Sequence, residues 1–215
     1  MQSKVLIADD HPLFRAAMRQ ALSELVGNAI LEASSYEEAR SCLEQHDDID
    51  LVFLDIRMPG NEGLTGLGEI RSRFPDVLVV MVSAEDAPAL ISRAMDLGCS
   101  GFIPKSTPLP VILEAVQKVL DGDRWLPDDY DAAAGGVQDE QQQAFAEGLA
   151  QLTPHQFNVL KMLADGLLNK QIAYELDISE STVKQHVSAV LKKLQVNNRT
   201  QAGIIFRQMM DVGQP

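Results

Sequence analysis

The stretch Val5-Leu6-Ile7-Ala8-Asp9-Asp10 joins a short apolar run to two carboxylates, and it decides how the N-terminal half folds. Four consecutive apolar residues are typical of a central parallel strand whose two faces are both covered. The same arrangement returns at 51–54, directly before Asp55, and at 77–82, directly before Ser83. Polar side chains therefore stand where three buried strands are expected to end.

Amphipathic segments alternate with apolar runs as far as residue 120. We expect strands at 5–8, 29–33, 51–54, 77–82 and 101–103, and helices at 12–25, 35–45, 64–74, 87–97 and 108–120. These alternations predict an α/β fold with a doubly wound, flavodoxin-like sheet of five parallel strands. Sheets of this kind place their functional sites at the carboxyl ends of the strands.

Charge is distributed unevenly along the 215 residues, whose formal net charge is −13. Residues 1–120 carry 10 basic and 18 acidic side chains, residues 121–150 carry 1 and 8, and residues 151–215 carry 7 and 5. The overall charge argues against nucleic-acid binding, whereas the mildly basic C-terminal segment permits a DNA-binding end.

The composition changes after residue 121, where acidic residues, an alanine–glycine run and three glutamines follow one another. We interpret 122–149 as an acidic, polar linker, with a helix near 139–150. The chain then divides into an N-terminal domain at 1–121 and a small C-terminal domain at 150–215.

The C-terminal domain shows a purely helical pattern. Thr153 is expected to cap a helix that stops at Gly166, and Asn169 to cap a short helix that ends near residue 176. Ser179 caps a longer helix that ends at 194, and a last helix reaches about residue 210. A short helix, a tight turn and a longer helix predict a helix-turn-helix.

The sequence also points to a compartment. Cys42 and Cys99 belong to no metal-binding or paired motif, so we interpret both as buried small apolar residues in a reducing environment. The N-terminus lacks the apolar region of a signal peptide, and no apolar run has the length of a membrane span. We expect a cytoplasmic protein without a membrane segment.

Five polar side chains, Asp9, Asp10, Asp55, Ser83 and Lys105, stand at the ends of four predicted strands. Because the first and third strands are neighbours in such a sheet, the three carboxylates converge and repel one another. A divalent cation relieves the repulsion, and hard oxygen ligands suit Mg²⁺. Ser83 and Lys105 add a hydroxyl and a cation, a set suited to a phosphoryl group. These residues predict phosphoryl transfer onto Asp55, with Asp9 and Asp10 holding the metal.

An ordered set of motifs resembles the receiver domain of response regulators, and more narrowly the NarL/FixJ type. The resemblance covers residues 3–121 and rests on LIADDHPLFR at 6–15, LDIRMPG at 54–60, VSA at 82–84 and GFIPKS at 101–106. It implies that a histidine kinase phosphorylates Asp55.

The resemblance also implies how the metal is bound. Asp10, Asp55 and the backbone carbonyl of Arg57 would bind Mg²⁺, and Asp9 would support the metal through water. His11, in the first turn of the next helix, is interpreted as a structural or half-exposed residue.

The same resemblance assigns the remaining pocket residues. Ser83 and Lys105 would bind the phosphoryl oxygens, and Ser83 would form a switch pair with Phe102, whose ring turns inward as the hydroxyl moves toward phosphate. Ser106 stands where many receivers have a proline with a cis bond, so the geometry of the Lys105–Ser106 bond is left open. Phe102 lacks a tyrosine hydroxyl.

The segment from Leu152 to Val187 closely resembles the LuxR-type DNA-binding domain, and the resemblance covers about residues 150–210. The longer helix carries an apolar stripe at helical spacing, with polar residues beside it. Three of these polar residues are expected to face base edges in the major groove: Lys184, Gln185 and Ser188. Phosphate contacts are expected from Lys170, Thr182, Lys192, Lys193 and Arg199. His186 is interpreted as scaffold.

The sequence therefore predicts a two-component response regulator, not an enzyme, in which phosphorylation of Asp55 controls sequence-specific DNA binding and transcription. Expected partners are DNA, a sensor histidine kinase and a second copy of the chain that pairs through the last helix. RNA polymerase is a candidate contact. The two copies would read half-sites about 34–36 Å apart.

Three alternatives are weighed against this function. A constitutive DNA-binding protein would have a degenerate acidic pocket. A carboxylate-dependent phosphatase would need a general acid and a substrate cap, and neither is apparent. A regulator that senses a small molecule would share the C-terminal half and lack the acidic pocket.

Overall fold

Five parallel strands form one sheet in the order β2-β1-β3-β4-β5 in the computed structural model, which describes residues 3–61, 63–130 and 140–211. The strands are β1 (Lys4–Ala8), β2 (Ile30–Ala33), β3 (Ile49–Asp55), β4 (Leu78–Ser83) and β5 (Gly101–Pro104). This sheet confirms the predicted doubly wound fold. Strand order reverses between β1 and β3, and ligands bind beside such a reversal in open α/β sheets.

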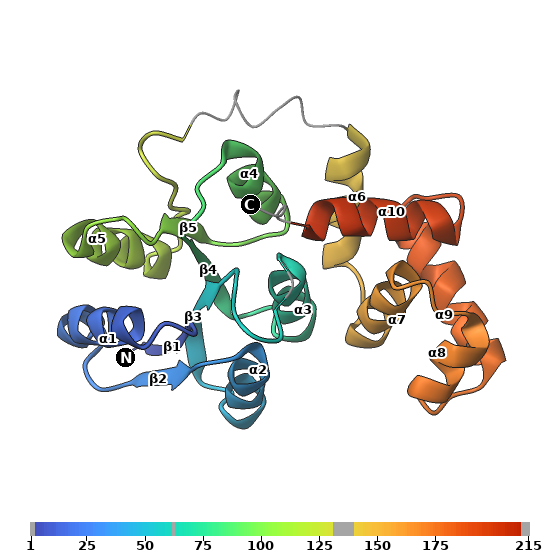
Figure 1. The fold of residues 1–215 in the computed structure, drawn as a ribbon, viewed down its shortest axis with the longest axis horizontal. Coiled ribbons are helices and arrows are strands. Elements are labelled where there is room, and N and C mark those ends of the chain that lie inside the picture. Colours follow the sequence, from blue (N-terminus) through green and yellow to red (C-terminus); the bar gives the residue numbers. More distant parts are fainter. Residues whose placement is uncertain (1–2, 62, 131–139, 212–215) are drawn as a thin grey trace.

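Helices cover both faces of the sheet (Figure 1). On one face lie α1 (Pro12–Val26) and α5 (Leu109–Leu120), and on the other lie α2 (Tyr36–Gln45), α3 (Thr65–Arg73) and α4 (Pro88–Asp96). Each face has its own hydrophobic core, so neighbouring residues of a strand are buried on opposite sides. This two-sided burial is the physical reason why the strands are apolar at consecutive positions.

Local signals set most element boundaries. The Ser35 side chain accepts the N–H of Glu38 at 3.3 Å and begins α2 as predicted. Gly98 follows α4 with φ of +87°, a backbone conformation that favours glycine. The main difference from the expectation is β3, which extends from Ile49 to Asp55, so that Asp55 is the last residue of the strand.

The segment interpreted as a linker includes residues that pack on both domains. Trp125, only 7% exposed, joins the core beneath α5, and it forms a bridge with Gly101 at the edge of the sheet. The helix expected near 139–150 is present as α6 (Glu140–Ala150), which buries Phe145. The rest of the expected linker, 131–139, lies outside the described residues.

Four further helices form the C-terminal bundle: α7 (Pro154–Ala164), α8 (Asn169–Glu175), α9 (Glu180–Lys193) and α10 (Arg199–Met210). Thr153 caps α7 through a reciprocal hydrogen-bond pair with Gln156, as expected for this position. The predicted cap at Asn169 is wrong by one residue. Leu168 precedes the helix, and its N–H is satisfied by the Gln171 side chain at 2.7 Å.

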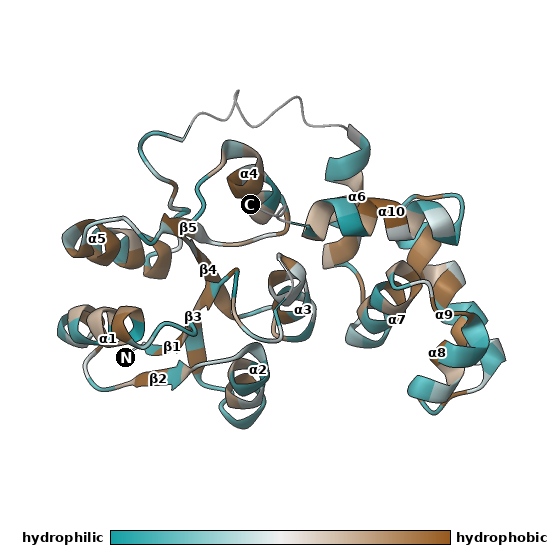
Figure 2. Ribbon diagram, in the orientation of Figure 1, coloured by the Kyte–Doolittle hydropathy of each residue, from teal (hydrophilic) through white to brown (hydrophobic). Residues whose placement is uncertain are grey.

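The bundle packs against the outer side of α3 and α4 (Figure 1). One hydrophobic cluster continues across the contact, from Leu67 in α3 to Phe157 in α7 and Met210 in α10. In Figure 2 the central strands are coloured largely hydrophobic, and the hydrophilic residues lie mainly on helices and loops. Among the residues described, no helix is both long and apolar enough to cross a membrane. Both cysteines are free; Cys99 is buried as predicted, whereas the prediction for Cys42 is wrong, because it is only half-buried.

Helix α6 approaches α9 so closely that Gly148 has no room for a side chain. A Cβ there would stand 2.5 Å from the Lys193 carbonyl oxygen. We expect Gly148→Ala to lower the free energy of unfolding by about 1–3 kcal/mol, despite the better helix propensity of alanine. Chemical denaturation measures this change. The exposed neighbour offers the control Glu147→Ala, expected within about 0.5 kcal/mol of wild type, and a stabilised Gly148→Ala protein would contradict the packing argument.

Candidate functional site

An acidic pocket lies at the carboxyl edge of the sheet, where the sequence predicts it. Asp9 follows β1 and is 1% exposed, Asp55 ends β3 at 2%, and Ser83 ends β4 at 3%. Lys105 follows β5 and reaches across this edge. Its Nζ lies 2.7 Å from Asp9 Oδ2 and 2.8 Å from Asp55 Oδ2. The fold thus brings together polar residues from four strand ends that are far apart in sequence.

Burial and like charge make the pocket electrostatically unfavourable when it holds only carboxylates. Burial raises the pKa of Asp55, the hydrogen bond from Lys105 opposes this shift, and the neighbouring charge of Asp9 adds to it. Burial alone would lower the pKa of Lys105, but its hydrogen bonds to Asp55 and Asp9 reverse that effect and raise it. Asp55 therefore lies between the negative charge of Asp9 and the positive charge of Lys105. A bound cation or phosphoryl group would change the net charge around it.

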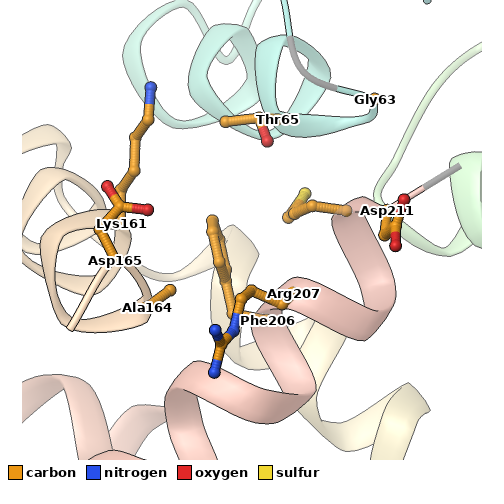
Figure 3. Close-up of a pocket in the computed structure, with 9 residues that line it drawn as sticks. Gly63, Thr65, Lys161, Ala164, Asp165, Phe206, Arg207 and Asp211 are labelled. Atoms are coloured by element: carbon orange, nitrogen blue, oxygen red, sulfur yellow. The ribbon is translucent and has the colours of Figure 1, made fainter.

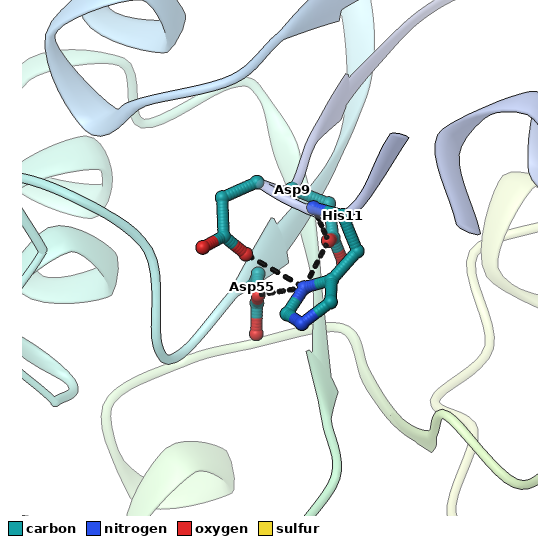
Figure 4. A group of neighbouring side chains, drawn as sticks. Asp9, His11 and Asp55 are labelled. Atoms are coloured by element: carbon teal, nitrogen blue, oxygen red, sulfur yellow. Dashed lines mark hydrogen bonds and ion pairs between the residues drawn. The ribbon is translucent and has the colours of Figure 1, made fainter. Parts of the chain in front are cut away.

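His11 belongs to this pocket, although the sequence was interpreted as giving it only a structural or half-exposed position; its side chain is 64% exposed. Its Nδ1 lies 2.6 Å from Asp10 Oδ1, 3.1 Å from Asp9 Oδ1 and 3.9 Å from Asp55 Oδ2 (Figure 4). The Lys105 Nζ is also within 3.2 Å of this nitrogen. The one sequence feature that pointed to this placement is that His11 directly follows Asp10. The sequence analysis considered only residues at the ends of strands, so it left His11 out of the pocket.

The side chains fit a hard divalent cation. Ligand atoms from Asp9, Asp10, His11 and Asp55 all lie within 4.8 Å of one another. The oxygens Asp9 Oδ2 and Asp10 Oδ1 are buried, and the groups beside them are Lys105 Nζ at 2.7 Å and His11 Nδ1 at 2.6 Å. Such carboxylate oxygens are the ligands that Mg²⁺ prefers. Arg57 N–H donates to Asp55 Oδ1 at 3.2 Å, which keeps its backbone beside the pocket.

The predicted switch pair flanks the pocket. Ser83 Oγ accepts the Glu85 N–H at 2.9 Å, and Glu85 in turn pairs with the Arg57 guanidinium at 2.5 Å. Phe102 of β5 is fully buried. Every peptide bond in the described residues is trans, including Lys105–Ser106, which the sequence left open.

The helix-turn-helix presents the three residues expected to face bases. Lys184, Gln185 and Ser188 are exposed on α9, while Val183 and Val190 of the same helix are buried in the bundle. Lys170 and Lys192 are exposed as well, and Thr182 is half-buried beside Ser179, the cap of α9. His186 packs edge to face on His155 with ring centroids 6.2 Å apart, in line with a scaffold role.

Two predicted phosphate contacts are engaged inside the bundle. Lys193 Nζ donates to the Gln151 carbonyl and to Gln156 Oε1, each at 2.8 Å. The Arg199 guanidinium donates to the Leu167 carbonyl and, at 3.2 Å, to Asn169 Oδ1. These bonds tie helix ends together, so both residues have a structural task whether or not they also touch DNA.

Comparison with known families agrees with this division. Residues 5–117 match the family described as the response regulator receiver domain, and residues 150–206 match the bacterial regulatory proteins of the luxR family. The chain belongs to the LuxR-type response regulators. Members of this group combine a receiver with a DNA-binding domain and regulate transcription, rather than acting as enzymes.

Similar proteins extend over nearly the whole response regulator. A glycerol metabolism activator of Pseudomonas putida is 44% identical, with 93% of this chain and 92% of that protein covered. The nitrate/nitrite response regulator NarL of Escherichia coli K12 is 30% identical, with 95% and 94% covered. The structure of RcsB in complex with DNA shares the fold, with a TM-score of 0.58 at 22% identity over 96% of this chain and 98% of that chain.

Removing the charge of Asp55 should stabilise the metal-free response regulator at neutral pH. Because burial holds its folded-state pKa above the unfolded value, the wild type loses stability as pH rises through that interval, and Asp55→Asn does not. The advantage of the variant should grow as the pH rises above about 4, the ordinary pKa of an aspartate. Urea denaturation at several pH values, with exposed Asp47→Asn as the control, measures it. An advantage that is largest in acid would contradict the electrostatic argument.

Substituting an exposed basic residue of the bundle should affect DNA binding, whereas substituting one that is hydrogen-bonded within the bundle should affect stability. We expect Lys184→Ala to weaken operator binding roughly tenfold to hundredfold with little change in thermal stability. Lys193→Ala should instead lower the thermal midpoint, because the Gln151 carbonyl loses its Lys193 donor and Gln156 Oε1 loses one of its two donors. Fluorescence anisotropy with a selected operator and thermal melts measure both. The reverse assignment of the two phenotypes would overturn the division.

Proposed function

We propose that a sensor histidine kinase phosphorylates this response regulator on Asp55, and that the aspartyl phosphate promotes sequence-specific DNA binding. The observation that carries the proposal is the convergence of Asp55, Asp9 and Lys105 at one edge of the sheet, with Lys105 Nζ within 2.8 Å of both carboxylates. A lone buried aspartate would carry no such meaning, since carboxylates often serve as turn or cap residues.

The chemical step is a transfer from nitrogen to oxygen. An Asp55 carboxylate oxygen attacks the phosphorus of a phosphohistidine on the kinase, the new O–P bond forms, and the N–P bond breaks with its electron pair left on the imidazole nitrogen. Lys105 offers its ammonium to the developing negative charge, and Ser83 offers a hydroxyl that donates a hydrogen bond to a phosphoryl oxygen.

A Mg²⁺ ion would be held by Asp10, Asp55 and the Arg57 backbone carbonyl, with Asp9 supporting it through water. When bound, the ion neutralises charge on both the carboxylate and the phosphoryl group. The side chains present fit such an ion because their carboxylate oxygens converge, and two of these oxygens, on Asp9 and Asp10, are buried.

The output is DNA recognition by a dimer. Lys184, Gln185 and Ser188 of α9 would contact base edges, and the exposed Lys170 and Lys192 would contact phosphates. A second copy would pair through α10, where Ile204 is 44% exposed. We favour activation of transcription, with RNA polymerase as a candidate contact, because the relative at 44% identity is named an activator.

The decisive experiment compares operator affinity with and without a small phosphate donor such as acetyl phosphate. Wild type should bind at least tenfold more tightly after phosphorylation, and Asp55→Ala should bind the same in both conditions. Intact-protein mass spectrometry verifies one phosphoryl group on wild type and none on the variant. Equal affinity in all four samples would overturn the proposal.

A further inference from the structure

The last turn of α10 ends against the receiver domain. A helix leaves its final carbonyls without partners from its own backbone. Here, the receiver supplies them: Arg93 Nη1 donates to the carbonyls of Gln208 at 2.7 Å and Asp211 at 2.6 Å. The Leu64 N–H donates to the Met210 carbonyl at 3.0 Å. One domain therefore caps a helix of the other.

The electrostatics of this cap are favourable. Leu64 is the residue that precedes the first turn of α3, so the positive end of the α3 dipole meets the negative end of α10. The guanidinium of Arg93 adds a cation at the same helix end. A cap of this kind depends on where the first turn of α3 stands.

Two glycines at the start of α3 mark the positions where other parts of the chain approach it. Each costs about 1 kcal/mol in helix propensity relative to alanine. A Cβ on Gly68 would stand 3.0 Å from the Phe157 ring and 3.4 Å from Met210. A Cβ on Gly66 would stand 2.6 Å from Asn61 Oδ1. Gly66 thus admits the loop before α3, and Gly68 admits the C-terminal domain.

Asn61 connects the end of β3 to this helix. Its Nδ2 donates to the carbonyls of Asp55 at 3.0 Å and Ile56 at 3.2 Å. Its Oδ1 accepts the Gly66 N–H at 3.0 Å. One side chain therefore bonds both the backbone of the phosphoacceptor and the first turn of the helix that caps α10.

We propose that Asn61 is a positioning residue that couples the phosphoacceptor loop to the DNA-binding domain, by holding the first turn of α3 against the last turn of α10. The inference rests on the proposed function, in which the state of Asp55 controls the C-terminal domain. A displacement of the Asp55 backbone on phosphorylation pulls on Asn61, moves Leu64 and uncaps α10.

The contact between the two domains is not fully packed. Beside it a cleft remains open between Thr65 of α3, Lys161 and Asp165 of α7, and Arg207 of α10 (Figure 3). The two domains are thus incompletely packed at the edge of the cap, and less contact is lost when they part. The base-facing residues Lys184, Gln185 and Ser188 are already exposed, so the receiver acts on α10 and not by covering α9.

Hydrogen exchange of the full chain, without DNA, tests the coupling. In wild type, beryllofluoride, a phosphoryl mimic, should speed exchange in the last turn of α10 roughly tenfold. Asn61→Ala should show the fast exchange before beryllofluoride is added, and little further change afterwards. Gly68→Leu should also expose α10 while the first turn of α3 stays protected, because it wedges the contact without touching the loop.

Two further variants keep the result interpretable. Asn61→Asp is isosteric, keeps the acceptor for Gly66 and loses both donors to the β3 end, so it should abolish the beryllofluoride response of α10 even if Asn61→Ala proves unstable. Asn28→Ala, in an exposed turn, is the matched control and should behave as wild type.

Slow, wild-type exchange at α10 in the Asn61 variants, still accelerated by beryllofluoride, would overturn the coupling. Operator affinity, measured separately, reports on the proposed function. If phosphorylation fails to raise that affinity while the Asn61 variants loosen α10, the proposed control of DNA binding fails and the coupling stands.

Discussion

The ion pairs of Lys105 with Asp9 and Asp55 are the interaction on which this response regulator depends. They join three strand ends across the point where the strand order reverses, and they offset part of the cost of burying two carboxylates 1–2% exposed. In this arrangement one ammonium group faces two carboxylates, with Asp10 and His11 close by, so negative charge is in excess. Cation binding and phosphoryl transfer both act on a site whose charge is not yet balanced.

Helix α3 connects this pocket to the C-terminal domain. Its N-terminal end is bonded through Asn61 to the Asp55 backbone, and its outer face lies against Phe157 and Met210 of the C-terminal domain. Glycine at 66 and 68 weakens α3 as an isolated helix and permits both approaches. The helix propensity of α3 is therefore lower at the two positions where other parts of the chain pack against it. Low local stability is typical of elements that move.

The basic residues of the bundle divide by environment rather than by type. Lys184 and Lys192 extend into solvent from α9, whereas Lys193 and Arg199 close helix ends with hydrogen bonds to backbone carbonyls and side-chain oxygens. A protein with net charge −13 therefore offers DNA a small basic surface, and the rest of its charge limits non-specific association.

The sequence by itself determined the five-stranded sheet, the helix-turn-helix and the convergence of Asp9, Asp55, Ser83 and Lys105, because periodicity and strand ends are local and strand neighbours follow from topology. It could not place His11 in the pocket, Trp125 in the receiver core, or the bonds of Lys193 and Arg199, since each depends on partners distant in the chain or on a side-chain direction. Only the tertiary structure decided that α3 and Arg93 cap α10. The last carbonyls of a helix accept hydrogen bonds from whichever donor packs against them, and the sequence of neither helix predicts which donor that is.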